Sequence, residues 1–201
     1  MNIFNINNDI ISQEYNKNNY LMILFDNNTL GLIKNTCALL RNEEDKNVDI
    51  IQTFGKVVVF QWYPFCSLDD NSFCYGNIDN EVYYVNLNSE KKYESKITLN
   101  NKIKEYKNSK IVNIQWYISD ENFKYILIGF DTTDICLCDM SENNATIITK
   151  FERSGKNLNK LIWMKNEPGL FMAFFKNSSK ISIFNVSSPN VKSITKFTDN
   201  R

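Results

Sequence analysis

Short apolar runs separated by polar turns make up most of the chain, and they follow one recurring order. The best-formed example lies within residues 111–139. The run IVNIQW ends at Trp116, and after a loop the run YILIGF, residues 125–130, leads through a polar turn into ICLCD, residues 135–139. Short runs rich in Ile, Val, Phe and Tyr are typical of β-strands. The segment therefore predicts three consecutive strands with a tight turn between the second and the third.

The same order recurs along the chain and predicts four repeats. Gln61-Trp62-Tyr63 returns as Gln115-Trp116-Tyr117, and the runs IIQTF, IITKF and SITKF close three of the repeats. Self-similarity at a fixed period identifies repeat architectures. Each repeat predicts four strands, and the first strand of the opening repeat is expected within Met1–Ile11, where Phe4, Ile6, Ile10 and Ile11 would supply it. The expected repeats span residues 1–54, 55–99, 110–151 and 157–197 of a single domain, residues 1–201.

The third strand of each repeat is apolar on both of its faces. Alternate residues of a strand share one face, and each alternating apolar pair is followed by a further apolar residue. The pairs are Leu30 and Leu32, Val82 and Tyr84, Ile135 and Leu137, and Ile181 and Ile183. Both faces of each sheet are therefore expected to be covered, as in sheets stacked between neighbours. We see no amphipathic helical pattern between the strands, which argues against a strand–helix–strand fold.

Four-stranded units of about 45 residues with this order resemble the blades of WD-repeat β-propellers. The Trp-Asp dipeptide of that family falls at Ile33-Lys34, Val85-Asn86, Cys138-Asp139 and Phe184-Asn185, so only Asp139 is kept. The family's turn aspartate is present as Asp26, Asp79 and Asp131, and is replaced by Lys176 in the last repeat. Its Gly-His dipeptide is missing. The hydrogen-bond network that links these family residues therefore cannot form, and we expect apolar packing and strand ladders alone to hold the blades together.

Three segments, residues 60–85, 111–140 and 163–187, resemble consecutive blades of one large protein of this family that occurs in animals. That protein has more blades than this chain can hold. The resemblance implies that the chain is a relative of a section of such a propeller, or a shortened gene product. The expected fold class is all-β, a β-propeller of about four WD-like blades, either a small closed ring or an open partial propeller. Propellers close with about four to eight blades. Blades shaped for larger rings have the wrong angle between blades for a ring of four, which favours the open arc. A partner or a second copy would then complete the ring.

Composition and charge exclude several classes of function. The 201 residues, 43% of them hydrophobic, are enough to bury a core. Lysine plus arginine equals aspartate plus glutamate, 23 each, which gives no electrostatic argument for nucleic acid or an acidic membrane. An odd number of cysteines and no signal-like N-terminus predict reduced thiols in an intracellular, cytoplasmic protein. No apolar run approaches the roughly 20 residues that span a bilayer.

Residues with chemical potential are few. The chain has no histidine, which removes Ser–His–Asp and Cys–His devices and histidine ligands for zinc. Cys136 and Cys138 are interpreted as buried thiols, because structural zinc sites need two C-x₂₋₄-C pairs. The tryptophans are interpreted as packing residues between repeats. The sequence therefore predicts no catalytic residues, no metal site and no cofactor.

Two surfaces remain as candidates for partner binding. The turns between the second and third strands, residues 26–29, 78–81, 131–134 and 176–180, are expected on one face of the ring. Their candidate residues are Asp26, Asp79, Asp131, Asp134 and Lys176. The loop 100–110 carries Lys102, Lys104, Lys107 and Lys110 around Tyr106, a pattern that suits phosphate contacts.

Three functions are consistent with these features. The resemblance implies a non-catalytic protein-interaction scaffold, or a subunit of a larger assembly, whose partners are other proteins. The alternative is nucleic-acid or phosphoinositide binding through residues 100–110, which strong salt dependence would reveal. An enzyme carried on a propeller is disfavoured, because no convergent polar motif accompanies the missing histidine.

Overall fold

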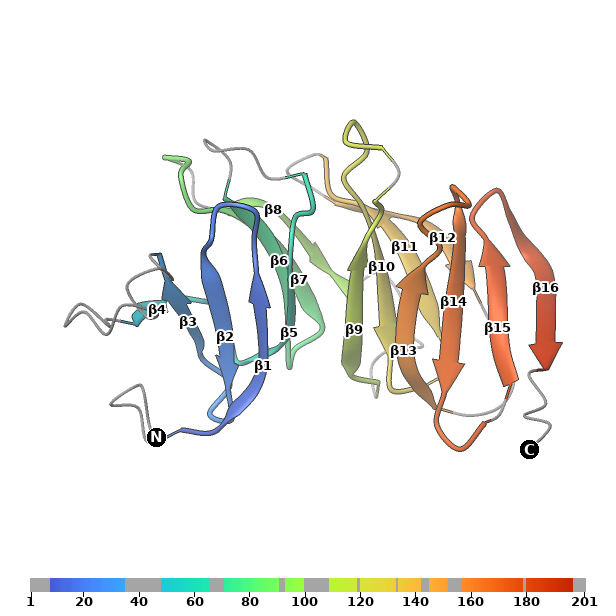
Figure 1. Ribbon diagram of the computed structural model, residues 1–201, viewed down its shortest axis with the longest axis horizontal. Helices are drawn as coiled ribbons and strands as arrows, with labels where there is room; N and C mark the ends of the chain where they lie inside the picture. The colour runs from blue at the N-terminus through green and yellow to red at the C-terminus, as the bar shows by residue number, and fades with distance from the viewer. Residues whose placement is uncertain are drawn as a thin grey trace.

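The computed structural model describes residues 8–34, 48–65, 71–90, 93–99, 109–118, 120–132, 134–141, 145–151, 157–178 and 180–196, and these form four antiparallel sheets of four strands (Figure 1). Sheet 1 contains β1 (Ile10–Tyr15), β2 (Leu21–Phe25), β3 (Leu30–Ile33) and β4 (Asp49–Ile51). Sheet 2 contains β5 (Val57–Trp62), β6 (Ser72–Asn77), β7 (Glu81–Asn86) and β8 (Tyr93–Thr98). Sheet 3 contains β9 (Ile111–Trp116), β10 (Tyr125–Phe130), β11 (Ile135–Asp139) and β12 (Thr146–Phe151). Sheet 4 contains β13 (Leu158–Trp163), β14 (Leu170–Phe175), β15 (Lys180–Asn185) and β16 (Ser188–Lys196). The all-β prediction is confirmed.

Each sheet is a simple meander in which neighbouring strands follow one another in the chain. The first strand of every sheet carries a register shift near its start, where it pairs with the second strand. Since the four registers agree, equivalent positions can be assigned from pairing alone. Glu14, Gln61, Gln115 and Ile162 are one such set, opposite Met22, Cys74, Leu127 and Met172.

The opening strand corrects one prediction. It was expected within Met1–Ile11, but β1 begins at Ile10 and ends at Tyr15. Its sequence, IISQEY, mixes polar residues with apolar ones, and Tyr15 stands where the other sheets have tryptophan. The polar content hides the strand in the sequence, and its residues other than Glu14 are exposed. Phe4 and Ile6 lie outside the described residues.

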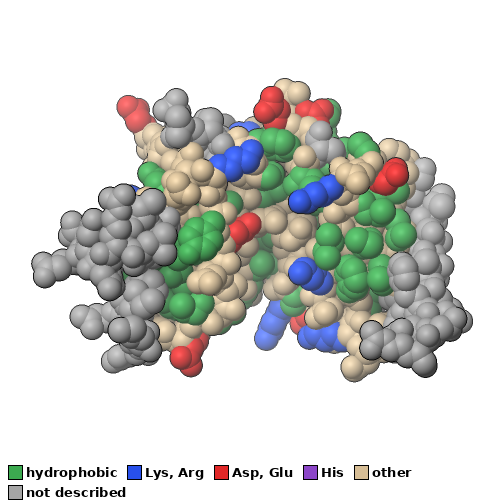
Figure 2. All heavy atoms as spheres, viewed as in Figure 1, with side chains coloured by type: hydrophobic (Ala, Val, Ile, Leu, Met, Phe, Trp, Pro, Cys, Tyr) green, Lys and Arg blue, Asp and Glu red, His purple; other side chains and the backbone are tan. Residues whose placement is uncertain are grey.

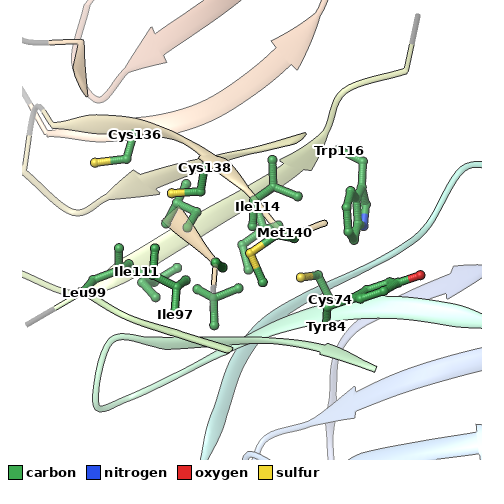
Figure 3. Packing of buried hydrophobic residues seen from close by; sticks show 14 of the residues in the cluster. Cys74, Tyr84, Ile97, Leu99, Ile111, Ile114, Trp116, Cys136, Cys138 and Met140 are labelled. Atoms are coloured by element: carbon green, nitrogen blue, oxygen red, sulfur yellow. The ribbon is translucent and has the colours of Figure 1, made fainter. Parts of the chain in front are cut away.

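Apolar clusters fill the spaces between consecutive sheets. The first strands β5, β9 and β13 each pack on the preceding sheet, which places one cluster between sheets 1 and 2, one between sheets 2 and 3 and one between sheets 3 and 4. Figure 3 shows the middle cluster, where Trp116 and Ile114 of sheet 3 face Tyr84 and Cys74 of sheet 2. The middle strands of sheets 2 and 3 are thus buried on both faces, as the sequence predicts.

The four sheets form an open row. Sheets 1 and 4 lie at opposite ends of the long axis in Figure 1, and no strong packing contact joins their described strands. The structure therefore shows no closed ring. No helix within the described residues is long and apolar enough to cross a membrane.

Gly129 in β10 lets sheet 4 approach sheet 3 closely. A methyl group added there would overlap the Leu158 side chain and lie 3.0 Å from Cδ1 of Leu161. Both leucines are buried in the cluster between sheets 3 and 4. We expect Gly129→Ala to lower the free energy of unfolding by about 1–3 kcal/mol, the usual cost of overpacking a core. Urea denaturation measures this loss.

Gly76 is the matched control, because it holds the equivalent position in sheet 2. Its added methyl would lie 3.2 Å from the nearest atoms of Ile111, so Gly76→Ala should cost less than Gly129→Ala. Equal costs for the two variants would show that the close approach of Leu158 is not the cause.

Candidate interaction site

A tryptophan clasp joins each sheet to the one before it. The indole Nε1 of Trp62 donates to the carbonyl of Glu14 at 3.0 Å, and that of Trp116 donates to the carbonyl of Gln61 at 3.3 Å. The indole of Trp163 donates to the carbonyl of Gln115 at 3.4 Å. Each acceptor is the residue just before position 15, 62 or 116 of the preceding sheet, and these three positions are equivalent by register. The same contact therefore repeats at every junction. The tryptophans are therefore packing residues with a fixed polar contact.

Side-chain acceptors strengthen two of these junctions. The backbone N–H of Trp116 donates to Oε1 of Gln61 at 2.7 Å, and that of Trp62 donates to Oε2 of Glu14 at 3.1 Å. The prediction that apolar packing and strand ladders alone hold the blades together is therefore wrong. Tryptophan indoles and a Gln or Glu side chain provide polar links from sheet to sheet.

Glu14 lines a small pocket at the first junction, about 120 Å³ in volume, beside Trp62, Tyr63 and Trp116. Burial raises the pKa of its carboxyl from 4.5 to about 7, although the hydrogen bond from Trp62 opposes the rise. A perturbed carboxyl in a pocket is a candidate acid or base. Its role here is structural, because the next junction places the neutral Gln61 at the same position with the same backbone partner.

The turns between second and third strands share one edge of the row. The backbone N–H of Val57 donates to the carbonyl of Asn28 at 3.0 Å, and the N–H of Leu158 donates to that of Thr132 at 3.0 Å. At the middle junction the N–H of Ile111 donates to Oδ1 of Asn80 at 3.2 Å. Each of these turns therefore holds the start of the next sheet. Asn28 and Asn80 have positive φ angles of 65° and 57°, which asparagine tolerates.

Three of the predicted turn residues, Asp26, Asp79 and Lys176, are exposed on this edge. The other two are less exposed, and each accepts a local hydrogen bond. Oδ1 of Asp131 accepts the backbone N–H of Lys110 at 2.8 Å, and Oδ2 of Asp134 accepts the hydroxyl of Thr132 at 2.9 Å.

The exposed Lys110 therefore lies against the turn that contains Asp131. This contact connects the end of the loop 100–110 with the turns, which the sequence analysis treated as two separate candidate surfaces. Lys102, Lys104 and Lys107 lie outside the described residues. We define the turn edge as residues 26–29, 78–81, 131–134 and 176–180, as far as they are described.

The last residue of the third strand has a local role in sheets 2, 3 and 4. Oδ1 of Asn86, Asp139 and Asn185 accepts the backbone N–H two residues further on, at 2.9, 2.8 and 2.8 Å. Asparagine and aspartate both form such turns. Asn86 and Asn185 therefore end the third strand with the same turn that Asp139 forms.

Cysteines and acidic residues form no metal site in the described part of the chain. The thiols of Cys74, Cys136 and Cys138 are buried, and burial raises the pKa of the Cys74 thiol. Among the described residues no three potential ligands converge. Cys37 and Cys66 lie outside them.

The outer face of sheet 4, the face turned away from sheet 3, corrects the prediction that both faces of each sheet are covered. Six apolar side chains on it are only half-buried: Ile162, Leu170, Met172, Phe174, Ile181 and Ile183. Figure 2 shows hydrophobic side chains gathered over β13 and β14. Three of the equivalent residues in sheet 3, Leu127, Ile135 and Leu137, are fully buried beneath sheet 4. The apolar run of β14 and the alternating Ile181 and Ile183 of β15 do not reveal this exposure, because buried strands show the same patterns.

The opposite end of the row exposes the first strand of sheet 1. Ile10 and Tyr15 are 47% and 59% exposed, whereas their equivalents in the other sheets are at most 5% exposed. The inner strands of this sheet are already buried on the same side, through Leu21, Ile23 and Phe25. The exposed apolar side chains at this end are therefore Ile10, Ile11 and Tyr15 of β1 and Ile50 of β4.

Comparison with known proteins assigns the chain to no family: no protein-family model matches it, and neither does any curated protein.

Proposed function

We propose that the chain is a segment of a WD-like β-propeller that acts as a non-catalytic protein-interaction subunit of a larger assembly. The observation that carries the proposal is the half-exposed apolar face of sheet 4, whose equivalents in the other sheets are covered by the next sheet. Large apolar patches on a protein surface mark interaction sites. The repeated meander and the stacking through first strands support the WD-like assignment.

The chemistry of the described residues supports a binding role over a catalytic one. The Glu14 pocket, at about 120 Å³, is smaller than the roughly 300–1,000 Å³ typical of ligand sites. Its one titratable group with a raised pKa is committed to a backbone hydrogen bond. The turn edge adds exposed charges of both signs, Asp26, Asp79 and Lys176, which suits recognition of another protein more than of a polyanion.

Affinity capture of the tagged chain from its own cells, followed by native mass spectrometry, tests the proposal. We expect a stoichiometric complex that contains at least one protein other than this chain. A chain that associates with no other protein would contradict the proposal. Release of captured nucleic acid at raised salt would favour the alternative through residues 100–110.

Two exposed lysines on opposite edges of sheet 4 allow a test of whether the turn edge contacts the partner. Lys176 lies in the turn after β14, whereas Lys165 lies in the loop before it. If the turn edge contacts the partner, Lys176→Gln should weaken the complex severalfold, mainly by slowing association. Lys165→Gln removes the same charge from the other edge and should leave the affinity unchanged.

A further inference from the structure

The two ends of the row are complementary to each other. We infer that the outer face of sheet 4 binds the strand β1 of a second copy of this chain, head to tail. The inference rests on the proposed function, because it names the partner of the apolar face on which that function depends. The inference is based on the three junctions within the chain, in each of which the first strand of one sheet packs on the preceding sheet.

Sheet 4 carries the acceptor half of that interface. In sheets 1, 2 and 3 the residues equivalent to Met172 are Met22, Cys74 and Leu127, and each is fully buried under the first strand of the following sheet. Ile181 and Ile183 likewise match buried apolar residues in all three sheets. The carbonyl of Ile162 holds the register position from which Glu14, Gln61 and Gln115 accept an indole N–H. Sheet 4 therefore presents the surface on which a first strand docks.

The strand β1 carries the donor half. Ile10 is equivalent to Val57, Ile111 and Leu158, and Tyr15 is equivalent to Trp62, Trp116 and Trp163, by pairing register. These six equivalents are buried in the junctions, whereas Ile10 and Tyr15 are exposed. The Tyr15 hydroxyl can donate a hydrogen bond as an indole N–H does. A docked β1 would bury both of its side chains together with the apolar face of sheet 4.

The bulk of Phe174 is compatible with this docking. Its equivalents in sheets 2 and 3 are Gly76 and Gly129, which admit the next sheet, but in sheet 1 the position holds Leu24. Leu24 is buried in one cluster with Val57, the first residue of β5. A large side chain is therefore already accommodated at the first junction, opposite a residue close in size to Ile10.

In a pair of chains joined in this way, the β1 strand of each copy contacts sheet 4 of the other, so neither end stays exposed. A head-to-tail contact leaves open ends unless its rotation closes a ring, and eight sheets lie within the range in which propellers close. Closure within one chain would need sheets 1 and 4 to meet, and they lie at opposite ends of the row (Figure 1). The favoured assembly is a pair of chains with two identical contacts.

Sedimentation equilibrium of the full chain over a range of concentrations tests this inference. We expect a mass of twice the 23.6 kDa of one chain. Tyr15→Lys and Met172→Lys should each weaken association at least tenfold. An equimolar mixture of the two variants should recover dimers, because the intact β1 of one variant meets the intact sheet 4 of the other. Folding of each variant is checked by circular dichroism.

Ile50→Lys is the matched control, since Ile50 is an exposed isoleucine on β4 of sheet 1, away from β1. The equivalent residues of sheets 2 and 3 are already Lys96 and Lys150, so this variant should fold and dimerise normally. A chain that stays monomeric at every concentration, or a dimer unaffected by Tyr15→Lys, would overturn the inference. A chain that stays monomeric but captures another protein would contradict the dimer and support the proposed function. A chain that dimerises but captures no other protein would contradict the proposed function and support the dimer.

Discussion

Replacing Trp116 by alanine is expected to lower the free energy of unfolding by about 3–5 kcal/mol, as for other fully buried aromatic side chains. Trp116 is 1% exposed and lies at the junction of sheets 2 and 3. Its ring packs edge-on against Tyr63 and Tyr84, at centroid distances of 5.0 and 5.6 Å. Its indole also donates to the Gln61 carbonyl. The substitution therefore opens a cavity and breaks the clasp at the centre of the row.

The position of Trp116 adds a second expected effect. In stacked repeats stability comes from each unit and from its interfaces with the neighbouring units. Weakening the middle interface should uncouple sheets 1 and 2 from sheets 3 and 4, so the urea transition should broaden and its m-value should fall. Far-UV circular dichroism follows the transition without relying on tryptophan fluorescence.

Two variants separate the causes. Trp116→Phe keeps an aromatic ring but removes the N–H donor, and should cost about 1–2 kcal/mol. Phe123→Ala removes an exposed aromatic ring that stacks on Tyr125 outside the clusters, and should cost less than 1 kcal/mol. A Trp116→Ala variant as stable as Phe123→Ala would contradict the role of the clasp.

The second large effect is a dependence of stability on pH through Glu14. Because its pKa is about 7 in the folded chain and near 4.5 when unfolded, the folded state binds the proton more tightly. The contribution of Glu14 is therefore complete below pH 4.5, declines as the pH rises from 4.5 to 7, and is lost above 7. The shift corresponds to at most about 3 kcal/mol.

Glu14→Gln should remove this dependence, because a neutral amide accepts the Trp62 N–H as Gln61 accepts that of Trp116. We expect the variant to be about 1–3 kcal/mol more stable than the natural chain at pH 8, but less than about 1 kcal/mol more stable at pH 5. Urea denaturation at the two pH values measures the difference.

Gln61→Glu is the reciprocal control at the next junction. It introduces a carboxyl at the equivalent position and should destabilise the chain more at pH 8 than at pH 5. If the stability difference between Glu14→Gln and the natural chain were the same at both pH values, burial of the Glu14 carboxyl would not govern the first junction.

The strands of sheets 2, 3 and 4 were predictable because their apolar residues alternate or run together over five or six positions. The strand β1 was misplaced because only two of its six residues are aliphatic, and its identity depends on pairing register. Glu14 could not be recognised for the same reason: its equivalence to Gln61 becomes visible only when the registers are aligned. The exposed face of sheet 4 was hidden because its residues resemble those of buried strands. Burial depends on what stacks on a sheet, which no local pattern records.

Cross-linking between the two ends of the row distinguishes an open row with complementary ends from a closed ring of four sheets. In the existing junctions the tryptophan of one strand contacts the carbonyl at position 14, 61 or 115 of the preceding sheet. A chain carrying both Tyr15→Cys and Ile162→Cys places thiols at the same two positions. The purified chain is treated with a short bis-maleimide, and the single variants report the background from the natural cysteines.

An open row with complementary ends predicts cross-links between two chains, seen as a dimer band on a denaturing gel. A mixture of the two single variants should give the same dimer, with residue 15 of one chain linked to residue 162 of the other by peptide mass. A cross-link within a single chain would contradict the account, because it would require sheets 1 and 4 to meet in a closed ring of four.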